Sequence, residues 1–371
     1  MPTIIFKASE KCNSNCIYCD VVERKAPRIM SLNLLELVFQ KMNEYLEEKP
    51  EEEINLTWHG GEPCTLGVNY FKKALEFQER HCSKTKSRLR HSIQSNLTLI
   101  NQEFLDIFKD IGIDTIGTSY EPIPHIRGGG RKRDSDSYNR LFMKGINLLD
   151  KNNFSWGYIY VVTKRALENP LNIFYFLSNL KLSGLFNINP VLVYENNDKH
   201  NIAITPLEFA EFLGKIFPVW WEHQDRYPGV QPFKSYLRNY KENARCLGCT
   251  ESGACAYNYL YIGPSGKVSH CGRSADWDII SYGNIKERPL SVIFKDEQRK
   301  ILEKRNEVLR DTECADCIYW GICHGGCPLD AYNNQKDFLH KTEWCEAKKV
   351  FLEKYFEPIT ELKRDFSEKD D

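Results

Sequence analysis

The sequence lacks the features that would mark a membrane, secreted or nucleic-acid-binding protein. No apolar stretch approaches the ~20 residues that a membrane-spanning helix needs, and the first residues show no secretory signal. The formal net charge is only −1, so no overall field favours nucleic acid or an acidic membrane surface. Internal repeats and low-complexity segments are also missing. These absences predict a cytoplasmic globular protein without a membrane or nucleic-acid partner.

Cysteine, in contrast, is abundant. The chain of 371 residues has 14 cysteines, whereas secreted disulfide scaffolds are usually small. Three cysteines lie close together at Cys12, Cys16 and Cys19, and nine lie between Cys246 and Cys345. This clustering favours reduced thiols that bind metal. The two remaining thiols, Cys64 and Cys82, are expected to be buried and free, with a catalytic role for Cys64 as the alternative.

Short apolar runs alternate with longer amphipathic runs over the first two hundred or so residues. The predicted strands are Thr3–Lys7, Ile54–His59, Ser92–Leu97, Asp114–Ser119, Trp156–Val162 and Asn187–Tyr194. The predicted helices are one beginning at the N-cap Ser31, then Phe71–His81, Gln102–Ile111, Tyr138–Lys151, Leu171–Leu182 and Pro206–Ile216. Six strand–helix units indicate a partial (β/α)6 TIM-like barrel with its active site at the carboxyl ends of the strands. An open doubly wound sheet is the alternative that spacing leaves open.

The C-terminal part of the chain has a different pattern. The aromatic, turn-rich segment Trp220–Lys241 is expected to be a linker. Two apolar runs, Tyr257–Ile262 and Lys267–Cys271, flank Gly263-Pro264-Ser265-Gly266 and predict a β-hairpin. The segment Thr342–Lys363 is expected to be helical. We therefore predict a barrel domain over residues 1–225 and a cysteine-rich domain over residues 226–371.

Cys12, Cys16 and Cys19 form the pattern C-x3-C-x2-C directly after the first predicted strand. Three thiolates are one short of the four that usually hold a [4Fe–4S] cluster, so one iron would stay open to another ligand. A structural zinc site is the alternative, but zinc normally takes four ligands and no histidine lies in this loop. Tyr18, just before Cys19, could shield the cluster.

The motif and the tyrosine resemble the signature of the radical S-adenosylmethionine (SAM) superfamily. The resemblance implies that SAM chelates the open iron through its amino and carboxylate groups. It also implies that an electron from the cluster cleaves SAM, and that the resulting 5′-deoxyadenosyl radical takes a hydrogen atom from the substrate. The expected activity is that of a radical SAM oxidoreductase.

Further residues match SAM-binding positions of this superfamily. Gly60, Gly61, Glu62 and Pro63 follow the second strand, where the family's GGEP motif contacts the SAM amino group. Glycines let the backbone approach a ligand, and a carboxylate can accept from an ammonium. An ordinary turn is the alternative. The resemblance also implies SAM contacts from polar residues at or after later strands, namely Ser95, Asn96, Ser119, Arg127 and Arg140. The glycine-rich insert at residues 128–137 is expected to be a solvated loop.

The C-terminal cysteines resemble the SPASM domain, a module of radical SAM enzymes that modify proteins and peptides. Cys314, Cys317, Cys323 and Cys327 form C-x2-C-x5-C-x3-C, and Cys345 follows. The resemblance implies two auxiliary [4Fe–4S] clusters, three clusters in all. Auxiliary cluster I would take Cys249, Cys255, Cys271 and Cys327, and auxiliary cluster II would take Cys314, Cys317, Cys323 and Cys345. Cys246 is the alternative to Cys249, and a pair of structural zinc sites is the alternative to the clusters.

The same cluster spacing occurs in anaerobic sulfatase-maturating enzymes, which oxidise a cysteine or serine of a target protein to formylglycine. Those enzymes carry an aspartate, thought to take the substrate proton, directly after the cysteine that matches Cys271. This chain has Gly272 there. We therefore expect a peptide or protein maturase that crosslinks, oxidises or epimerises its substrate, with sulfatase maturation or a small-molecule substrate as alternatives. The candidate bases are Asp276, Glu121 and Tyr120. The expected partners are a polypeptide substrate and a flavodoxin- or ferredoxin-type electron donor.

Overall fold

The computed structural model describes the chain except for residues 20–25, 131, 181–185, 195–197, 243–246 and 364–371. The chain forms two compact units. The first contains Met1–Tyr158 and Ala256–Arg299, and the second contains Ile159–Cys255 and Lys300–Asp371. The boundaries of these units differ from those of the predicted domains, 1–225 and 226–371. The predicted domains follow the two cysteine-rich regions of the sequence and stay a prediction. In the described part of the chain, no helix is long and apolar enough to cross a membrane.

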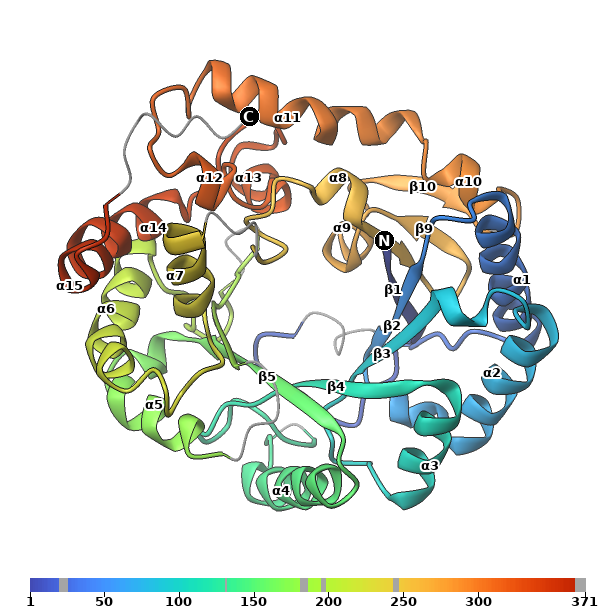
Figure 1. The fold of residues 1–371 in the computed structure, drawn as a ribbon. Helices are drawn as coiled ribbons and strands as arrows, with labels where there is room; N and C mark the ends of the chain where they lie inside the picture. The colour runs from blue at the N-terminus through green and yellow to red at the C-terminus, as the bar shows by residue number, and fades with distance from the viewer. Residues whose placement is uncertain (20–25, 131, 181–185, 195–197, 243–246, 364–371) are drawn as a thin grey trace. The chain divides into compact units, whose positions relative to one another are not determined.

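A largely parallel sheet forms the centre of the first unit (Figure 1). Strand β1 pairs in parallel with β2 on one side and with β8 on the other, and β2, β3 and β4 continue the parallel order. The strand order is β10-β9-β8-β1-β2-β3-β4-β5. The bounds are β1 Thr3–Ser9, β2 Ile54–Gly60, β3 Leu89–Gln94, β4 Ile113–Ser119, β5 Ser155–Val162, β8 Tyr259–Ile262, β9 Lys267–Ser269 and β10 Ser281–Asn284. The strand β5 ends in the second unit.

Amphipathic helices cover the outer side of this sheet (Figure 1). Helix α1 begins as the sequence predicts, because the Ser31 side chain accepts a hydrogen bond from the backbone N–H of Leu34. Its apolar residues Leu35, Val38 and Met42 are fully buried. The helices of this unit are α1 Leu32–Glu48, η2 Pro63–Leu66, α2 Val68–His81, η3 Lys86–Arg88, α3 Gln102–Ile111, α4 Ser135–Lys151, α8 Cys255–Asn258 (whose first residue belongs to the second unit), α9 Gly272–Asp276, α10 Leu290–Ile293 and η5 Glu297–Arg299.

The predicted β-hairpin is confirmed, but it is not separate from the sheet. Strands β8 and β9 pair antiparallel, and Gly266 takes the left-handed φ of 87° that their turn requires. Strand β8 also pairs in parallel with β1, with Thr3 opposite Tyr259. The hairpin therefore extends the N-terminal sheet, and it carries Cys271 and α9 to the unit that contains the first cysteine motif.

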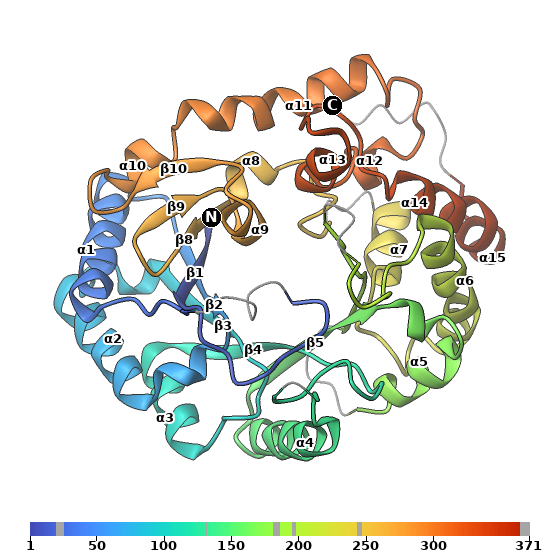
Figure 2. The ribbon, with the colours of Figure 1, turned by 180° about the vertical axis from the view of Figure 1, so that it is seen from behind.

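Aromatic packing builds the second unit. Helices α6 and α14 pack together (Figure 2). Phe217 of α6 contacts the rings of Phe351 and Phe356, with ring centroids 5.5 and 5.2 Å away. Thr205 and Glu208 cap α6 reciprocally at its start. The elements are η4 Lys164–Ala166, α5 Pro170–Ser178, β6 Phe186–Pro190, α6 Pro206–Glu222, β7 Val230–Gln231, α7 Phe233–Glu242, α11 Lys300–Asp311, α12 Trp320–Cys323, α13 Pro328–Gln335, α14 Cys345–Phe351, the π-turn η6 Leu352–Phe356 and α15 Glu357–Thr360. The predicted C-terminal helix over Thr342–Lys363 is thus present in three consecutive pieces.

The prediction that Trp220–Lys241 is a linker is wrong. This segment contains the end of α6, strand β7 and most of helix α7. Phe233 and Tyr236 lie three residues apart on α7 and are both buried, and Phe233 contacts Trp220 at 5.3 Å. The turn residues before α7 hid this helical period in the sequence.

Candidate active site

The three N-terminal cysteines lie in the loop that follows β1; they are partly buried and form no disulfide bond with a described residue. Burial raises the pKa of the Cys12 thiol to about 12, and the nearby Cys16 and Cys19 add to this rise. Burial likewise raises the pKa of Cys16 to about 11. Ionising these buried, neighbouring thiols together costs free energy. Binding of a metal centre meets this cost, because the metal replaces the thiol protons and stabilises the thiolates. The donor set therefore fits an iron–sulfur cluster.

The segment after β4 pairs with this cysteine loop. The backbone N–H of Asn15 donates to Gly128 O at 2.7 Å, and that of Ile17 donates to Ile126 O at 3.0 Å. The Arg133 Nε donates to Asn15 O at 2.6 Å. Most described residues of 128–137 are exposed, as expected of a solvated loop. Its pairing with the cysteine loop was not predicted, because contact with a segment far away in sequence is invisible to composition.

The glycines of GGEP let β2 end directly against the cysteine loop. A Cβ added at Gly60 would lie 2.2 Å from Ser9 O, and one at Gly61 would lie 2.3 Å from Lys11 O. The backbone N–H of Gly61 donates to Ser9 O at 2.9 Å. The sequence predicted that these glycines let the backbone approach a ligand. In the structure they also let the end of β2 approach the backbone of Ser9 and Lys11.

Glu62 is a buried carboxylate next to this loop. Its side chain accepts from Ser95 Oγ at 2.9 Å, from the Asn96 backbone N–H at 2.6 Å and from the Cys64 backbone N–H at 3.0 Å. Burial raises the pKa of Glu62 despite these hydrogen bonds. The Asn96 amide in turn donates to Asn13 Oδ1 at 2.9 Å. A desolvated, oriented carboxylate at the ends of β2 and β3 suits a cationic ligand such as an ammonium.

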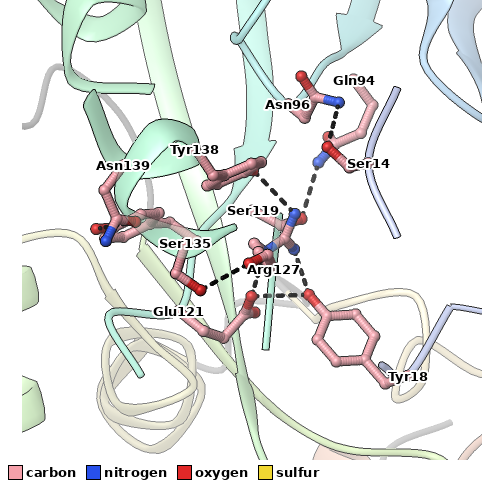
Figure 3. A network of polar contacts seen from close by, with 11 residues as sticks. Ser14, Tyr18, Gln94, Asn96, Ser119, Glu121, Arg127, Ser135, Tyr138 and Asn139 are labelled. Atoms are coloured by element: carbon pink, nitrogen blue, oxygen red, sulfur yellow. Dashed lines mark hydrogen bonds and ion pairs between the residues drawn. The ribbon is translucent and has the colours of Figure 1, made fainter. Parts of the chain in front are cut away.

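Arg127 is enclosed in a polar network between the cysteine loop and α4 (Figure 3). It pairs with the buried Glu121 through Nε, donates to Tyr18 through Nη2 and donates to Tyr138 Oη at 3.3 Å. The Tyr18 hydroxyl also donates to Glu121 at 2.9 Å. Arg127 and Tyr18, both predicted near SAM, are therefore joined, and they flank the thiols of the cysteine loop.

The other predicted SAM contacts lie in different surroundings. Ser119 ends β4, where its hydroxyl accepts from Gln94 Nε2 at 3.4 Å (Figure 3). Pro63 is buried at the start of η2. Arg140 is exposed on α4 and donates to Ser137 of the same helix at 3.2 Å. Arg140 thus has no described contact with the residues around Glu62.

Two of the three candidate bases are held by other groups. Tyr120 stacks on Phe142 with ring centroids 4.2 Å apart and donates to Asn139 at 3.0 Å. Burial raises the pKa of Tyr120 to about 12, so it stays protonated at neutral pH. The carboxylate of Glu121 is paired with Arg127. Tyr120 is therefore not a base at neutral pH, and the Glu121 side chain is only 1% exposed.

The third candidate, Asp276, ends α9 and pairs with Lys7 of β1 at 2.7 Å. The Lys7 side chain is 2% exposed and the Asp276 side chain 18% exposed. Desolvation and the Lys7 ammonium lower the pKa of the nearby His59 to about 4, so this imidazole is neutral. Sequence reasoning missed Lys7, although a lysine within the apolar run of β1 is an unusual signal.

The thiols predicted to hold auxiliary cluster II all lie in the second unit. Burial raises the pKa of Cys314 to about 12, with contributions from Cys317, Cys323 and Cys345. Next to Cys345, the buried indole N–H of Trp344 has no hydrogen-bond acceptor among the described residues. The mutual influence of these thiols is compatible with one shared cluster, and the indole N–H is a donor that a cluster sulfur atom could accept from.

The thiols predicted for auxiliary cluster I are described in part. Cys249 and Cys255 line one small cavity of the second unit, while Cys271 precedes α9 in the first unit. Cys246 lies outside the described residues. Among the described residues, no three His, Cys, Asp or Glu side chains are grouped so that they could hold a single metal ion.

Two family models match the regions that carry these cysteines. The model of the radical SAM superfamily matches residues 6–173, and the model of the SPASM iron–sulfur cluster-binding domain matches residues 254–318. The chain is a radical SAM enzyme with a SPASM domain. Its cofactors are accordingly SAM and iron–sulfur clusters.

Similar sequences cover nearly all of this radical SAM enzyme. A cysteine-type anaerobic sulfatase-maturating enzyme of Clostridium novyi is 26% identical over 96% of each chain. A serine-type enzyme of Bacteroides thetaiotaomicron is 24% identical over 88% of this chain and 82% of its own. The enzyme is thus related to the sulfatase-maturating enzymes at low identity.

Solved structures confirm the predicted fold class. The structure of native anSMEcpe with bound AdoMet and a Cp18Cys peptide has a TM-score of 0.81 and 22% identity, and covers 97% of this chain and 98% of that one. Streptococcus suis SuiB bound to the precursor peptide SuiA has a TM-score of 0.61 and 15% identity, over 93% of this chain and 76% of SuiB. These similarities establish the partial radical SAM barrel with its SPASM hairpin and exclude the open doubly wound sheet.

Replacing Glu62 with glutamine should weaken SAM binding by about ten- to a hundredfold, as expected for a lost hydrogen bond to a charged group worth ~1.5–3 kcal/mol. Equilibrium dialysis with labelled SAM under anaerobic conditions measures this directly. Glu53→Gln is the control, because Glu53 lies at the surface and pairs with Arg90. Unchanged SAM affinity in a Glu62→Gln enzyme with full iron content would contradict a SAM contact by this carboxylate.

Replacing Gly61 with alanine should destabilise the cysteine loop, because the added Cβ would overlap Lys11 O. The cost of such overpacking is about 1–3 kcal/mol. A thermal unfolding scan of the reconstituted protein should show a lower Tm, and iron content should fall. Gly272→Ala is the control, since a Cβ there meets nothing within 4 Å. Equal Tm values for the two variants would show that the loop accommodates a Cβ at Gly61 next to Lys11 O without strain.

Proposed function

We propose that this enzyme oxidises a side chain of a polypeptide substrate, with formylglycine formation from a cysteine or serine as the first candidate. The observation that carries the proposal is the extent of similarity to a cysteine-type anaerobic sulfatase-maturating enzyme. It runs over 96% of both chains and therefore includes both cysteine-rich regions. Bound peptide in the similar anSMEcpe structure supports a polypeptide substrate.

The ligand atoms described above indicate where the cofactors would bind. Cys12, Cys16 and Cys19 would hold one [4Fe–4S] cluster, and Glu62 with the β3 end would receive SAM. Eight of the nine C-terminal cysteines would hold two more clusters, with Cys249 as the first ligand of auxiliary cluster I and Cys246 left over. When bound, the first cluster and SAM supply hydrogen-atom abstraction. Ile126 and Gly128 hold the cysteine loop by accepting backbone hydrogen bonds from Ile17 and Asn15.

The contribution of the chain's own residues is proton transfer and orientation. Oxidation of a CH2–SH or CH2–OH group to the aldehyde level removes a hydrogen atom from carbon, a proton from sulfur or oxygen, and one further electron, for which an auxiliary cluster would be the acceptor. For a cysteine, water then replaces the sulfur, which leaves as hydrogen sulfide. Asp276 would accept the proton from sulfur or oxygen. It lies four residues after Gly272 on α9, so both positions are on the same face of the helix. Lys7 would orient the carboxylate through their 2.7 Å ion pair.

The second candidate is another peptide modification that begins with hydrogen abstraction, such as crosslinking or epimerisation. Gly272 favours it, because this chain lacks the aspartate that the sulfatase-maturating enzymes carry there. The fold similarity to SuiB, solved with its precursor peptide, is compatible with this reaction class.

Mass spectrometry of peptide substrates separates the candidates. The reconstituted enzyme is incubated with SAM, dithionite and a peptide from a sulfatase active site that contains either cysteine or serine. Conversion of the thiol or hydroxyl to an aldehyde supports the first candidate. Formation of 5′-deoxyadenosine without an aldehyde, together with modification of a peptide encoded beside the gene, would replace it with the second.

A further inference from the structure

The second unit contains a buried arginine with no charged partner. Arg305 of α11 is 4% exposed, and no carboxylate in the described part of the chain forms an ion pair with it. Its guanidinium donates to backbone carbonyls instead, at 2.7 to 3.0 Å. The acceptors are the carbonyl oxygens of Phe338, His324, Gly325 and His340. A desolvated cation that meets only neutral acceptors retains its full positive charge.

Cysteine thiols from two different predicted sets lie near enough to interact with this charge. The groups that interact electrostatically with Arg305 are Cys327, Cys323, Cys255 and Cys314. Arg305 also lines the small cavity that contains Cys249 and Cys255. One guanidinium therefore lies beside thiols predicted for auxiliary cluster I and thiols predicted for auxiliary cluster II.

The loop between Cys323 and Cys327 is shaped around Arg305. His324, Gly325 and Gly326 have left-handed φ values of 47°, 70° and 74°. A Cβ at Gly325 would lie 2.3 Å from Leu309 Cδ1 and 3.3 Å from Arg305 Nη2. The glycine thus leaves room chiefly for Leu309 and only secondarily for the guanidinium. The loop turns the carbonyls of His324 and Gly325 onto Arg305.

A second buried cation in this unit has a partner. Lys348 lies near Cys323, but its ammonium pairs with Glu251 at 2.8 Å, and Tyr236 donates to the same carboxylate at 3.0 Å. The charge of Lys348 is therefore compensated locally. Arg305 is the buried cation near these thiols whose charge the described residues leave uncompensated.

We propose that Arg305 is a positioning and charge-balancing residue for both auxiliary clusters, and that it makes them easier to reduce. The inference rests on the proposed function, in which eight thiolates hold two clusters. A four-thiolate [4Fe–4S] cluster is negatively charged, and one-electron reduction adds another negative charge. A fixed, desolvated cation beside it stabilises the reduced form more than the oxidised form.

A redox titration of the holoenzyme, followed by electron paramagnetic resonance, tests this role. Signals that change on SAM addition are assigned to the N-terminal cluster and set aside. In Arg305→Gln, the ratio of reduced to oxidised auxiliary cluster at a fixed potential should fall about tenfold, which is a 59 mV shift for a one-electron couple. Arg305→Lys should stay within about threefold of the parent, because it keeps the charge near the same place. Arg310→Gln, an exposed charge on the same helix, should leave the ratio unchanged.

A second variant tests the electrostatic effect without touching Arg305. Glu251→Gln keeps an acceptor for Tyr236 and Lys348 but removes the negative charge, so Lys348 becomes uncompensated near Cys323. The reduced fraction of an auxiliary cluster should then rise, opposite in sign to Arg305→Gln. This measurement remains available if Arg305→Gln does not fold.

The outcomes separate the two proposals. Equal loss of iron in Arg305→Gln and Arg305→Lys, with no shift in Glu251→Gln, would mean that the arginine only ties loops together, and the inference would be overturned. Fully loaded Arg305→Gln with an unchanged ratio would overturn it as well. A parent enzyme that binds only about four irons per chain, enough for one cluster, would instead refute the auxiliary clusters of the proposed function.

Discussion

The Cys16→Ala variant should lose about one third of its iron, about four of about twelve atoms per chain if three [4Fe–4S] clusters are present, and should form no 5′-deoxyadenosine above background. The reason lies in the number of ligands. Three thiolates hold the N-terminal cluster in the proposed arrangement, so removal of the middle one leaves two, at opposite ends of the loop. Iron analysis after anaerobic reconstitution and chromatographic detection of 5′-deoxyadenosine provide the measurements.

Cys82→Ala is the matched control for this experiment. Cys82 is fully buried, and its thiol donates a hydrogen bond to the Phe39 carbonyl oxygen at 3.5 Å. Phe39 belongs to helix α1 and not to the cysteine loop. The variant should keep its iron and its activity, with a modest loss of stability. If Cys16→Ala kept full turnover, the N-terminal thiols would not hold the catalytic cluster.

Local patterns predicted the strands and helices of the first unit well. Helix α3 has the predicted bounds Gln102–Ile111, because Asn101 caps its start and Gly112 takes a left-handed conformation at its end. Pairings between distant segments were not predictable in the same way. The contact between β8 and β1 joins residues more than 250 positions apart, and neither strand carries a local signal for its neighbour.

In the site, too, short motifs could be predicted from the sequence, whereas contacts between residues far apart in the chain could not. The cysteine spacings and GGEP are compact motifs, so a single stretch of sequence indicates their chemistry. The partners of the candidate bases are not encoded locally. Nothing near Glu121 in the sequence indicates that Arg127 and Tyr18 hold it, and Lys7 lies 269 residues from the Asp276 that it contacts.

The Asp276→Asn variant should lose about 10²- to 10⁴-fold of its rate of product formation, the usual range for removal of a general base. SAM cleavage should continue, because Asp276 pairs with Lys7 and is not among the residues proposed to hold the first cluster or SAM. The ratio of 5′-deoxyadenosine to modified peptide should therefore rise strongly. Asp278→Asn is the control, since that side chain is 76% exposed.

A double variant tests whether the position of the carboxylate decides the reaction. Gly272→Asp moves a carboxylate back by one helical turn, into a place where an added Cβ meets no atom within 4 Å. Combined with Asp276→Asn, it should restore part of the lost product, because residues four apart share a helix face. Equal product from Asp276→Asn and the parent enzyme would exclude Asp276 as the base. Gly272→Asp alone introduces a carboxylate at the position that carries the aspartate in the sulfatase-maturating enzymes. If this variant forms the same product as the parent enzyme, Gly272 does not determine which reaction occurs.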